Sequence, residues 1–108
     1  MIAAIHGGIA IAQQAHQHWQ NVTAANPGHV LGNPQDAFVV AEHDWGWVHV
    51  TYFATKEDAQ SYFDQAHLRR ILVDTNQPRG QREVAHAGAA DWVDNAIRVV
   101  LQQRGVLL

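Results

Sequence analysis

Histidine is the residue type in this sequence with the widest chemical range. The chain of 108 residues has 8 histidines against 7 lysines and arginines combined. An imidazole can ligate a metal ion, move a proton, or change its charge near neutral pH. His16 and His18 look like a metal-binding pair, but helical side chains two positions apart point about 200° away from each other. We therefore expect His16 to be a packed core histidine rather than a ligand.

His43 and His49 lie in two β-rich runs that flank Asp44-Trp45-Gly46, a pattern that predicts a β-hairpin. A two-residue turn would force Trp45 to a positive φ, so we predict a three-residue loop with Gly46 in the left-handed conformation. This register predicts an apolar face that packs toward the core and consists of Phe38, Val40, Val48, Val50 and Tyr52. The opposite face is polar and aromatic, and its predicted ligand-binding residues are His43, Trp47, His49 and Thr51.

The hairpin has an alternative register with different chemistry. A two-residue turn would gather Glu42, Asp44 and His49 on one face, and carboxylates beside an imidazole suit a metal ion or proton transfer. A third interpretation assigns these side chains to the solvated side of a half-exposed antiparallel sheet, which is a common arrangement. The turn therefore decides which side chains can act together.

Tryptophan is the second informative residue type, with 4 copies in the chain. Trp19 and Trp92 fall on helical stripes and are predicted to be core residues. A tryptophan at a hairpin tip either contacts a partner or folds back onto the sheet. An apolar tail follows Gly105. An exposed tip tryptophan and this tail together would give more exposed apolar surface than a small monomer usually keeps. We therefore predict a homodimer with an interface formed by Trp45, Val106, Leu107 and Leu108.

Four arginines gather around a proline and glycine turn, at Arg69, Arg70, Arg79 and Arg82. Arginine suits phosphate and carboxylate oxygens, but no glycine-rich phosphate loop accompanies this group. A solvated turn with ion pairs to Asp64, Asp74 or Glu83 is the favoured interpretation. The chain has a single serine and no cysteine, which excludes a serine-hydrolase elbow, a cysteine nucleophile, disulfides and iron–sulfur clusters.

The elements that must position these residues are short. An apolar stripe predicts a first helix from about residue 8 to 24, and a loop follows up to the hairpin. Thr55, followed by acidic residues, predicts the start of a helix. We extend this helix to about Leu72 because no residue before that point breaks it. The alternative is a strand at 71–73 paired with 83–85. A last helix is expected over about 89–104, with Gly105 as its C-cap.

These elements predict one α+β domain over residues 1–108, ordered helix, antiparallel hairpin, helix, a short strand or strands left open, and helix, with the helices packed on one face of the sheet. The apolar N-terminal residues carry no lysine or arginine and are interrupted by Gly7-Gly8, so we expect a soluble cytoplasmic protein without a membrane segment. The formal net charge is −3 and residues 1–55 contain no lysine or arginine, which argues against nucleic-acid binding.

The function predicted from these patterns is a small soluble binding or interaction module that uses the polar and aromatic sheet face for a small molecule or a protein partner. We expect no cofactor and no structural metal, because histidine sites need three or four convergent ligands. The alternative is a small enzyme or metal-binding protein that uses His43, His49, Glu42 and Asp44. No motif covers enough of the chain to indicate a family.

Overall fold

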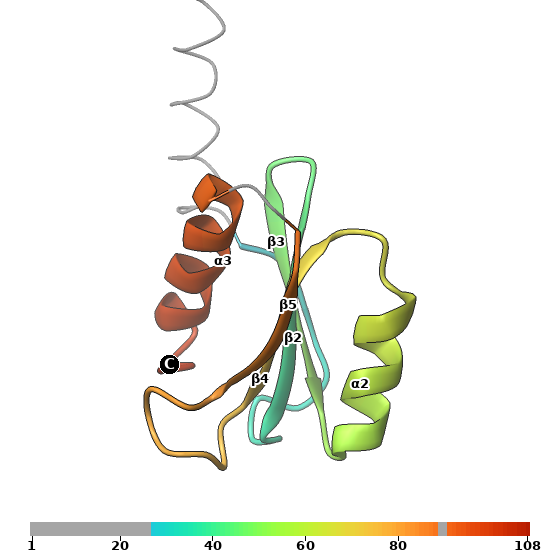
Figure 1. Ribbon diagram of the computed structural model, residues 1–108, viewed down its shortest axis with the longest axis vertical. Coiled ribbons are helices and arrows are strands. Elements are labelled where there is room, and N and C mark those ends of the chain that lie inside the picture. The colour runs from blue at the N-terminus through green and yellow to red at the C-terminus, as the bar shows by residue number, and fades with distance from the viewer. Residues whose placement is uncertain (1–26, 89–90) are drawn as a thin grey trace, which may run out of the picture.

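The computed structural model describes residues 27–88 and 91–108 and contains a five-stranded mixed sheet with a helix on each face (Figure 1). The strand order is β1-β3-β2-β4-β5, where β1 runs parallel to β3 and the other neighbours are antiparallel. The predicted helix at 8–24, with His16 and Trp19, lies outside the described residues. The elements are β1 (Pro27–Leu31), β2 (Phe38–Asp44), β3 (Trp47–Phe53), α2 (Lys56–Gln65), β4 (Arg69–Asp74), β5 (Glu83–Ala87) and α3 (Asp91–Gln103).

The β2–β3 hairpin closes with a two-residue turn, so the predicted three-residue loop is wrong. Asp44 pairs with Trp47, and both turn residues have positive φ, 47° at Trp45 and 86° at Gly46. This register puts the alternating apolar residues of both strands on one face. Burying each of these side chains contributes about 1.5–3 kcal/mol, which outweighs about 1–2 kcal/mol for one left-handed residue. The fully buried residues on that face are Val39, Ala41, Val48 and Val50.

The helices cover both faces of the sheet, which corrects the predicted packing on one face. Figure 1 shows α2 and α3 on opposite sides of the strands. The α3 side holds the larger core, in which Ile97 and Leu101 of the helix meet the hairpin. The α2 side holds a smaller core made of Val40, Ala59, Phe63 and Leu72. Since β2 and β4 lie between two helical layers, their consecutive residues are buried instead of alternating.

The segment after α2 is a strand, so the prediction of a helix to about Leu72 is wrong. The predicted N-cap is confirmed, because the Thr55 hydroxyl accepts a hydrogen bond from the Asp58 N–H at 3.2 Å. The helix nevertheless ends at Gln65, and β4 pairs with both β2 and β5. Three consecutive apolar residues fit a central strand, because both faces of such a strand are buried. The alternative prediction, a strand at 71–73 paired with 83–85, is confirmed, although the pairing has a register shift between Leu72 and Val73.

Strand β1 replaces part of the loop that the sequence predicts before the hairpin. Pro27 stands first in the strand, where its missing N–H is tolerated. Val30 pairs with Val50 and packs against the α3-side core. Parallel pairing with a strand twenty residues away leaves no local sequence signal, which is why a proline and glycine pair indicated only a loop.

The C-terminal residues fold back onto the core. Gly105 has φ 79° and acts as the predicted C-cap, and the Val106 N–H donates to the Leu101 carbonyl at 2.9 Å. Val106 is consequently buried in the α3-side core, with Leu108 partly buried against it. Within residues 27–88 and 91–108, no helix is long and apolar enough to cross a membrane.

Candidate functional site

The two-residue turn redistributes the predicted ligand-binding residues between two faces of the sheet. Trp47, His49 and Thr51 lie on the α2 side, where the register also places Glu42 and Asp44. His43 pairs with Val48, which belongs to the α3-side core, so the sheet separates His43 from the other three. The predicted set of four is therefore wrong as a single site, and the alternative set of Glu42, Asp44 and His49 is the one that shares a face.

Glu42 is a buried carboxylate held by Tyr62 of α2. It is only 6% exposed, and it accepts a hydrogen bond from the Tyr62 hydroxyl. Burial, and then the neighbouring carboxylate, raise the pKa of Tyr62, while a hydrogen bond from Thr51 opposes the rise. Tyr62 is not among the candidate site residues predicted from the sequence, although a buried tyrosine usually needs a polar partner for its hydroxyl.

Both ring nitrogens of His49 face polar groups. Nδ1 accepts a hydrogen bond from the His29 backbone N–H at 3.0 Å, and Nε2 lies 3.8 Å from Oδ2 of Asp44. The neutral ring must therefore carry its proton on Nε2, directed toward the carboxylate. A metal ligand or general base needs an available nitrogen lone pair, and the lone pair of Nδ1 is already used. This geometry favours a structural role for His49, which joins β1 to β3.

Metal-ligating side chains do not converge elsewhere in the described chain. Within residues 27–88 and 91–108, no group of three or more histidines, aspartates or glutamates has a metal-binding arrangement. Since His43 is separated from His49, the alternative of an enzyme or metal protein that uses His43, His49, Glu42 and Asp44 finds no assembled site.

The α2 side of β1 and β3 forms an exposed aromatic surface. Helix α2 packs on β2, β4 and part of β3, and Leu31 pairs with Thr51 on the same side of the sheet. Leu31 is 57% exposed, Trp47 is 48% exposed, and Trp45 at the turn is 89% exposed. We call this surface the tryptophan face, and it comprises His29, Leu31, Trp45 and Trp47.

The predicted interface residues lie apart. Trp45 belongs to the β2–β3 turn, whereas residues 106–108 follow α3 near the opposite end of the sheet (Figure 1). Leu107 remains 40% exposed, while Val106 is part of the core. The turn and the tail therefore do not form one continuous patch on a single chain.

The four arginines of the predicted cluster also separate. Arg69 and Arg70 begin β4, while Arg79 and Arg82 lie in the turn beyond its far end. Arg82 donates to the carbonyls of Gln77 and Leu107, each at 2.7 Å. Of the carboxylates expected to pair with these arginines, Asp74 instead accepts from the Asn76 N–H at 2.9 Å, and Glu83 pairs with a helix residue.

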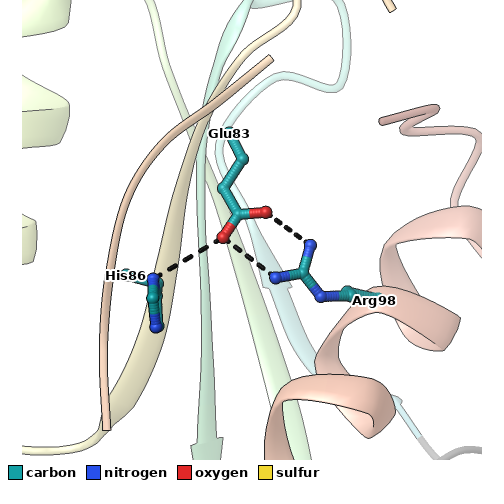
Figure 2. A network of polar contacts seen from close by, with 3 residues as sticks. All are labelled: Glu83, His86 and Arg98. Atoms are coloured by element: carbon teal, nitrogen blue, oxygen red, sulfur yellow. Dashed lines mark hydrogen bonds and ion pairs between the residues drawn. The ribbon is translucent and has the colours of Figure 1, made fainter. Parts of the chain in front are cut away.

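Figure 2 shows this ion pair, in which Glu83 of β5 binds Arg98 of α3 beside His86. The guanidinium donates two hydrogen bonds, NH1 to Oε2 at 2.5 Å and NH2 to Oε1 at 2.9 Å. The Arg98 hydrogen bond holds the pKa of Glu83 below its ordinary value, and Glu83 raises the pKa of Arg98. A bidentate pair of this kind fixes orientation as well as charge. No local pattern in the sequence predicts this pair, because the two residues are fifteen positions apart in different elements.

Comparison with known proteins finds no matching family model, no matching curated protein and no matching solved structure.

Proposed function

We propose that this protein is a small interaction module that self-associates through the tryptophan face and the edge of β1. The observation that carries the proposal is Trp45, which is 89% exposed and has φ 47°. A bulky side chain in the left-handed region costs about 1–2 kcal/mol, and asparagine or glycine would avoid that penalty. Among residues 27–88 and 91–108, Trp45 obtains little packing in exchange. Contact with a second molecule supplies that packing, and tryptophan is enriched among residues that dominate binding energy.

The edge strand supports the same proposal. Among the strands of residues 27–88, β1 lies at one edge of the sheet, and it contains no lysine, arginine, aspartate or glutamate. Exposed edges are usually protected by charged residues, because their free N–H and C=O groups can pair with another strand. Leu31 adds an exposed apolar side chain to this edge. An edge without charges suits strand addition, in which main-chain hydrogen bonds join two molecules.

The charge distribution favours a second copy as the occupant. Residues 1–55 contain no lysine or arginine, and Glu42, one of the three acids there, is buried. Two identical edges brought together by a two-fold axis therefore meet little charge repulsion, and such a contact needs only a self-complementary surface. We infer antiparallel β1 to β1 pairing, with Trp45 and Trp47 of each copy packed at the ends of the joined strands. The proposal includes a cytoplasmic location, which cell fractionation would test.

The test uses Trp45→Asn, because stability and association should move in opposite directions. Light scattering and sedimentation at micromolar concentrations should give about twice the 12.0 kDa chain mass for the unchanged protein. Trp45→Asn should shift the protein toward monomer. Measured at concentrations where the chain is monomeric, the same variant should be more stable by about 1 kcal/mol, because the left-handed strain is relieved.

Two further variants separate the edge from general surface hydrophobicity. Leu31→Lys places a charge on the β1 edge and should also yield monomer. Leu107→Ser, which removes an exposed leucine far from the tryptophan face, should leave the mass unchanged. A chain that stays monomeric at high concentration, or a dimer that is weakened only by Leu107→Ser, contradicts the proposal.

A further inference from the structure

A basic hollow lies at the end of the sheet where β4 begins. Its volume is about 320 Å³, a size that admits a small ligand. Loop residues after α2, the first residues of β4 and the residue after β5 contribute to it. The described residues that line it are His43, His67, Leu68, Arg69, Arg70 and Gly88. Four of these six carry a guanidinium or an imidazole, and none carries a carboxylate.

Arg70 is held in place without losing its charge. Its Nε donates to the Phe63 carbonyl at 2.5 Å and its NH1 donates to the Leu68 carbonyl at 2.7 Å. The guanidinium also lies 4.6 Å from the centre of the Phe63 ring. These hydrogen-bond partners are neutral, and a guanidinium has five N–H donors, so donors remain available, although the buried carboxylate of Glu42 lies opposite Arg70 in the β2–β4 ladder. A donor group fixed in advance binds an anion without a further loss of side-chain entropy.

Arg69 lies opposite His43 in the β2–β4 ladder, on the α3 side of the sheet. Gly88 has φ 115°, and a Cβ on it would lie 2.8 Å from the Arg69 Cβ. Only glycine therefore lets the chain after β5 pass so close to the arginine. Among residues 27–88 and 91–108, neither Arg69 nor Arg70 forms an ion pair with a carboxylate. Because consecutive strand residues point to opposite faces, Arg69 reaches this end of the sheet from the α3 side, whereas Arg70, which contacts Phe63 of α2, reaches it from the α2 side. Both residues line the same hollow, and guanidinium groups suit the oxygens of an anion.

His43 makes the hollow sensitive to pH. Burial, and then the Arg69 charge, lower the pKa of His43. Asp44 and a backbone hydrogen bond oppose the shift, and His49 adds to it. His67 and Arg70 line the same hollow. A bound anion would offset the field of the arginines and favour the protonated form of His43. Binding of an anion should therefore be coupled to proton uptake.

We propose that this hollow binds one tetrahedral oxyanion, such as the phosphate group of a small metabolite, through Arg69, with Arg70, His43 and His67 as additional donors. The ligand class is small because the chain has no extended basic surface. Its net charge is −3 and its first 55 residues lack lysine and arginine. A polyanion such as nucleic acid needs many phosphate contacts along such a surface.

The test measures binding of sulfate, inorganic phosphate and acetate by NMR at constant ionic strength. Sulfate and phosphate should shift the amide signals of residues 43, 69 and 88 saturably, and should bind tighter than acetate. Arg69→Gln should weaken sulfate binding at least tenfold, and Arg69→Lys should weaken it less. Arg79→Gln is the matched control, since it removes the same charge from an exposed turn and should leave binding unchanged.

The pH arm uses sulfate, because its charge is constant through the histidine range. Its affinity should increase as pH falls from 7.5 to 6, and His43→Gln should flatten that increase. Binding that does not saturate, equal weakening by Arg69→Gln and Arg79→Gln, or tighter binding of acetate than of sulfate would each overturn the proposal. These readouts are independent of the oligomeric state, so this site and the tryptophan face succeed or fail separately.

Discussion

At the scale of single residues, the hydrogen bonds of His49 determine where its proton lies. Nδ1 accepts from the His29 N–H, so the neutral ring is expected as the Nε2–H tautomer. Nitrogen-15 chemical shifts of the imidazole at pH 8 should show a protonated Nε2 and an unprotonated Nδ1. His86 provides a comparison within the same spectrum, because its side chain is 51% exposed and its Nδ1 faces a carboxylate. An Nδ1–H tautomer at His49 would refute the described contact between β1 and β3.

The second residue-scale prediction concerns the buried carboxylate. Tyr62→Phe removes the hydroxyl that donates to Glu42 and leaves a buried acceptor without that donor. Such a loss costs about 1–3 kcal/mol. Chemical denaturation should show this decrease in the free energy of unfolding.

Tyr52→Phe is the matched control for that experiment. Tyr52 is also buried, but in the described part of the chain its hydroxyl forms no hydrogen bond. Its removal should change the free energy of unfolding by less than about 1 kcal/mol. Equal effects of the two substitutions would show that the Tyr62 hydroxyl contributes nothing specific.

At the scale of elements, Gly28 permits the close approach of β1 to β3. A Cβ at this position would lie 2.5 Å from Nδ1 of His49 and 3.2 Å from the Cβ of Trp47. Gly28→Ala should therefore destabilise the protein by about 1–3 kcal/mol through overpacking, although alanine normally stabilises a strand relative to glycine.

Combining Gly28→Ala with His49→Ala shows whether a clash with His49 causes the loss of stability. Removing the imidazole opens the space that the new methyl group needs, so Gly28→Ala should be much less destabilising in the His49→Ala background. The free energies of unfolding of the two single variants and the double variant measure this coupling. Purely additive effects would mean that β1 does not pack against His49.

The irregularity in β5 is the second feature at this scale. Leu72 pairs with Ala85 and Val73 pairs with Glu83, so Val84 is an extra residue in β5. In a regular strand, Glu83 and Ala85 are two positions apart and would share a face. The bulge instead turns Glu83 toward the α3 side, where Arg98 binds it. A single inserted residue thus enables the ion pair that fastens α3 to the edge strand.

At the scale of the whole molecule, histidine and carboxylate groups should produce two separate ranges of pH-dependent stability. The pKa of His43 is lowered in the folded state by burial and Arg69. The unfolded chain therefore binds the proton more readily, and stability declines as pH falls from about 6.5 toward the lower folded pKa. The melting temperature should decrease over this range, and His43→Gln should flatten the decrease. A flat profile in the unchanged protein would contradict the described burial of His43.

The second range belongs to Glu83, whose pKa is lowered by Arg98. The stability that this pair contributes is present above the ordinary glutamate pKa and is lost as pH falls through the lower folded value. Glu83→Gln should remove this acid-range loss and should leave the histidine range unchanged. Because both side chains are partly exposed, we expect an effect of about 1 kcal/mol or less at pH 7.

Several features of this protein are determined by the sequence within a few residues. Thr55 begins α2 because its hydroxyl accepts the Asp58 N–H, and Gly105 ends the last helix because it adopts a positive φ. The two β-rich runs around Trp45-Gly46 form a hairpin for the same reason: strand propensity and a turn signal both act locally. These elements can be predicted from the sequence because each depends on residues close to it in the chain.

The tertiary structure decided the features that depend on distant partners. The hairpin turn is chosen by the core that it aligns, since Val39 and Val50 must both face α3, and this overrides the preference of Trp45 for negative φ. β1 is a strand only because β3 lies beside it, and 71–73 form a strand only because β2 and β5 flank them. The same long-range packing separates His43 from His49 and places it opposite Arg69. Side-chain identity supplied the candidate chemistry, but the free energy of burying two cores on opposite faces of one sheet determined which residues meet.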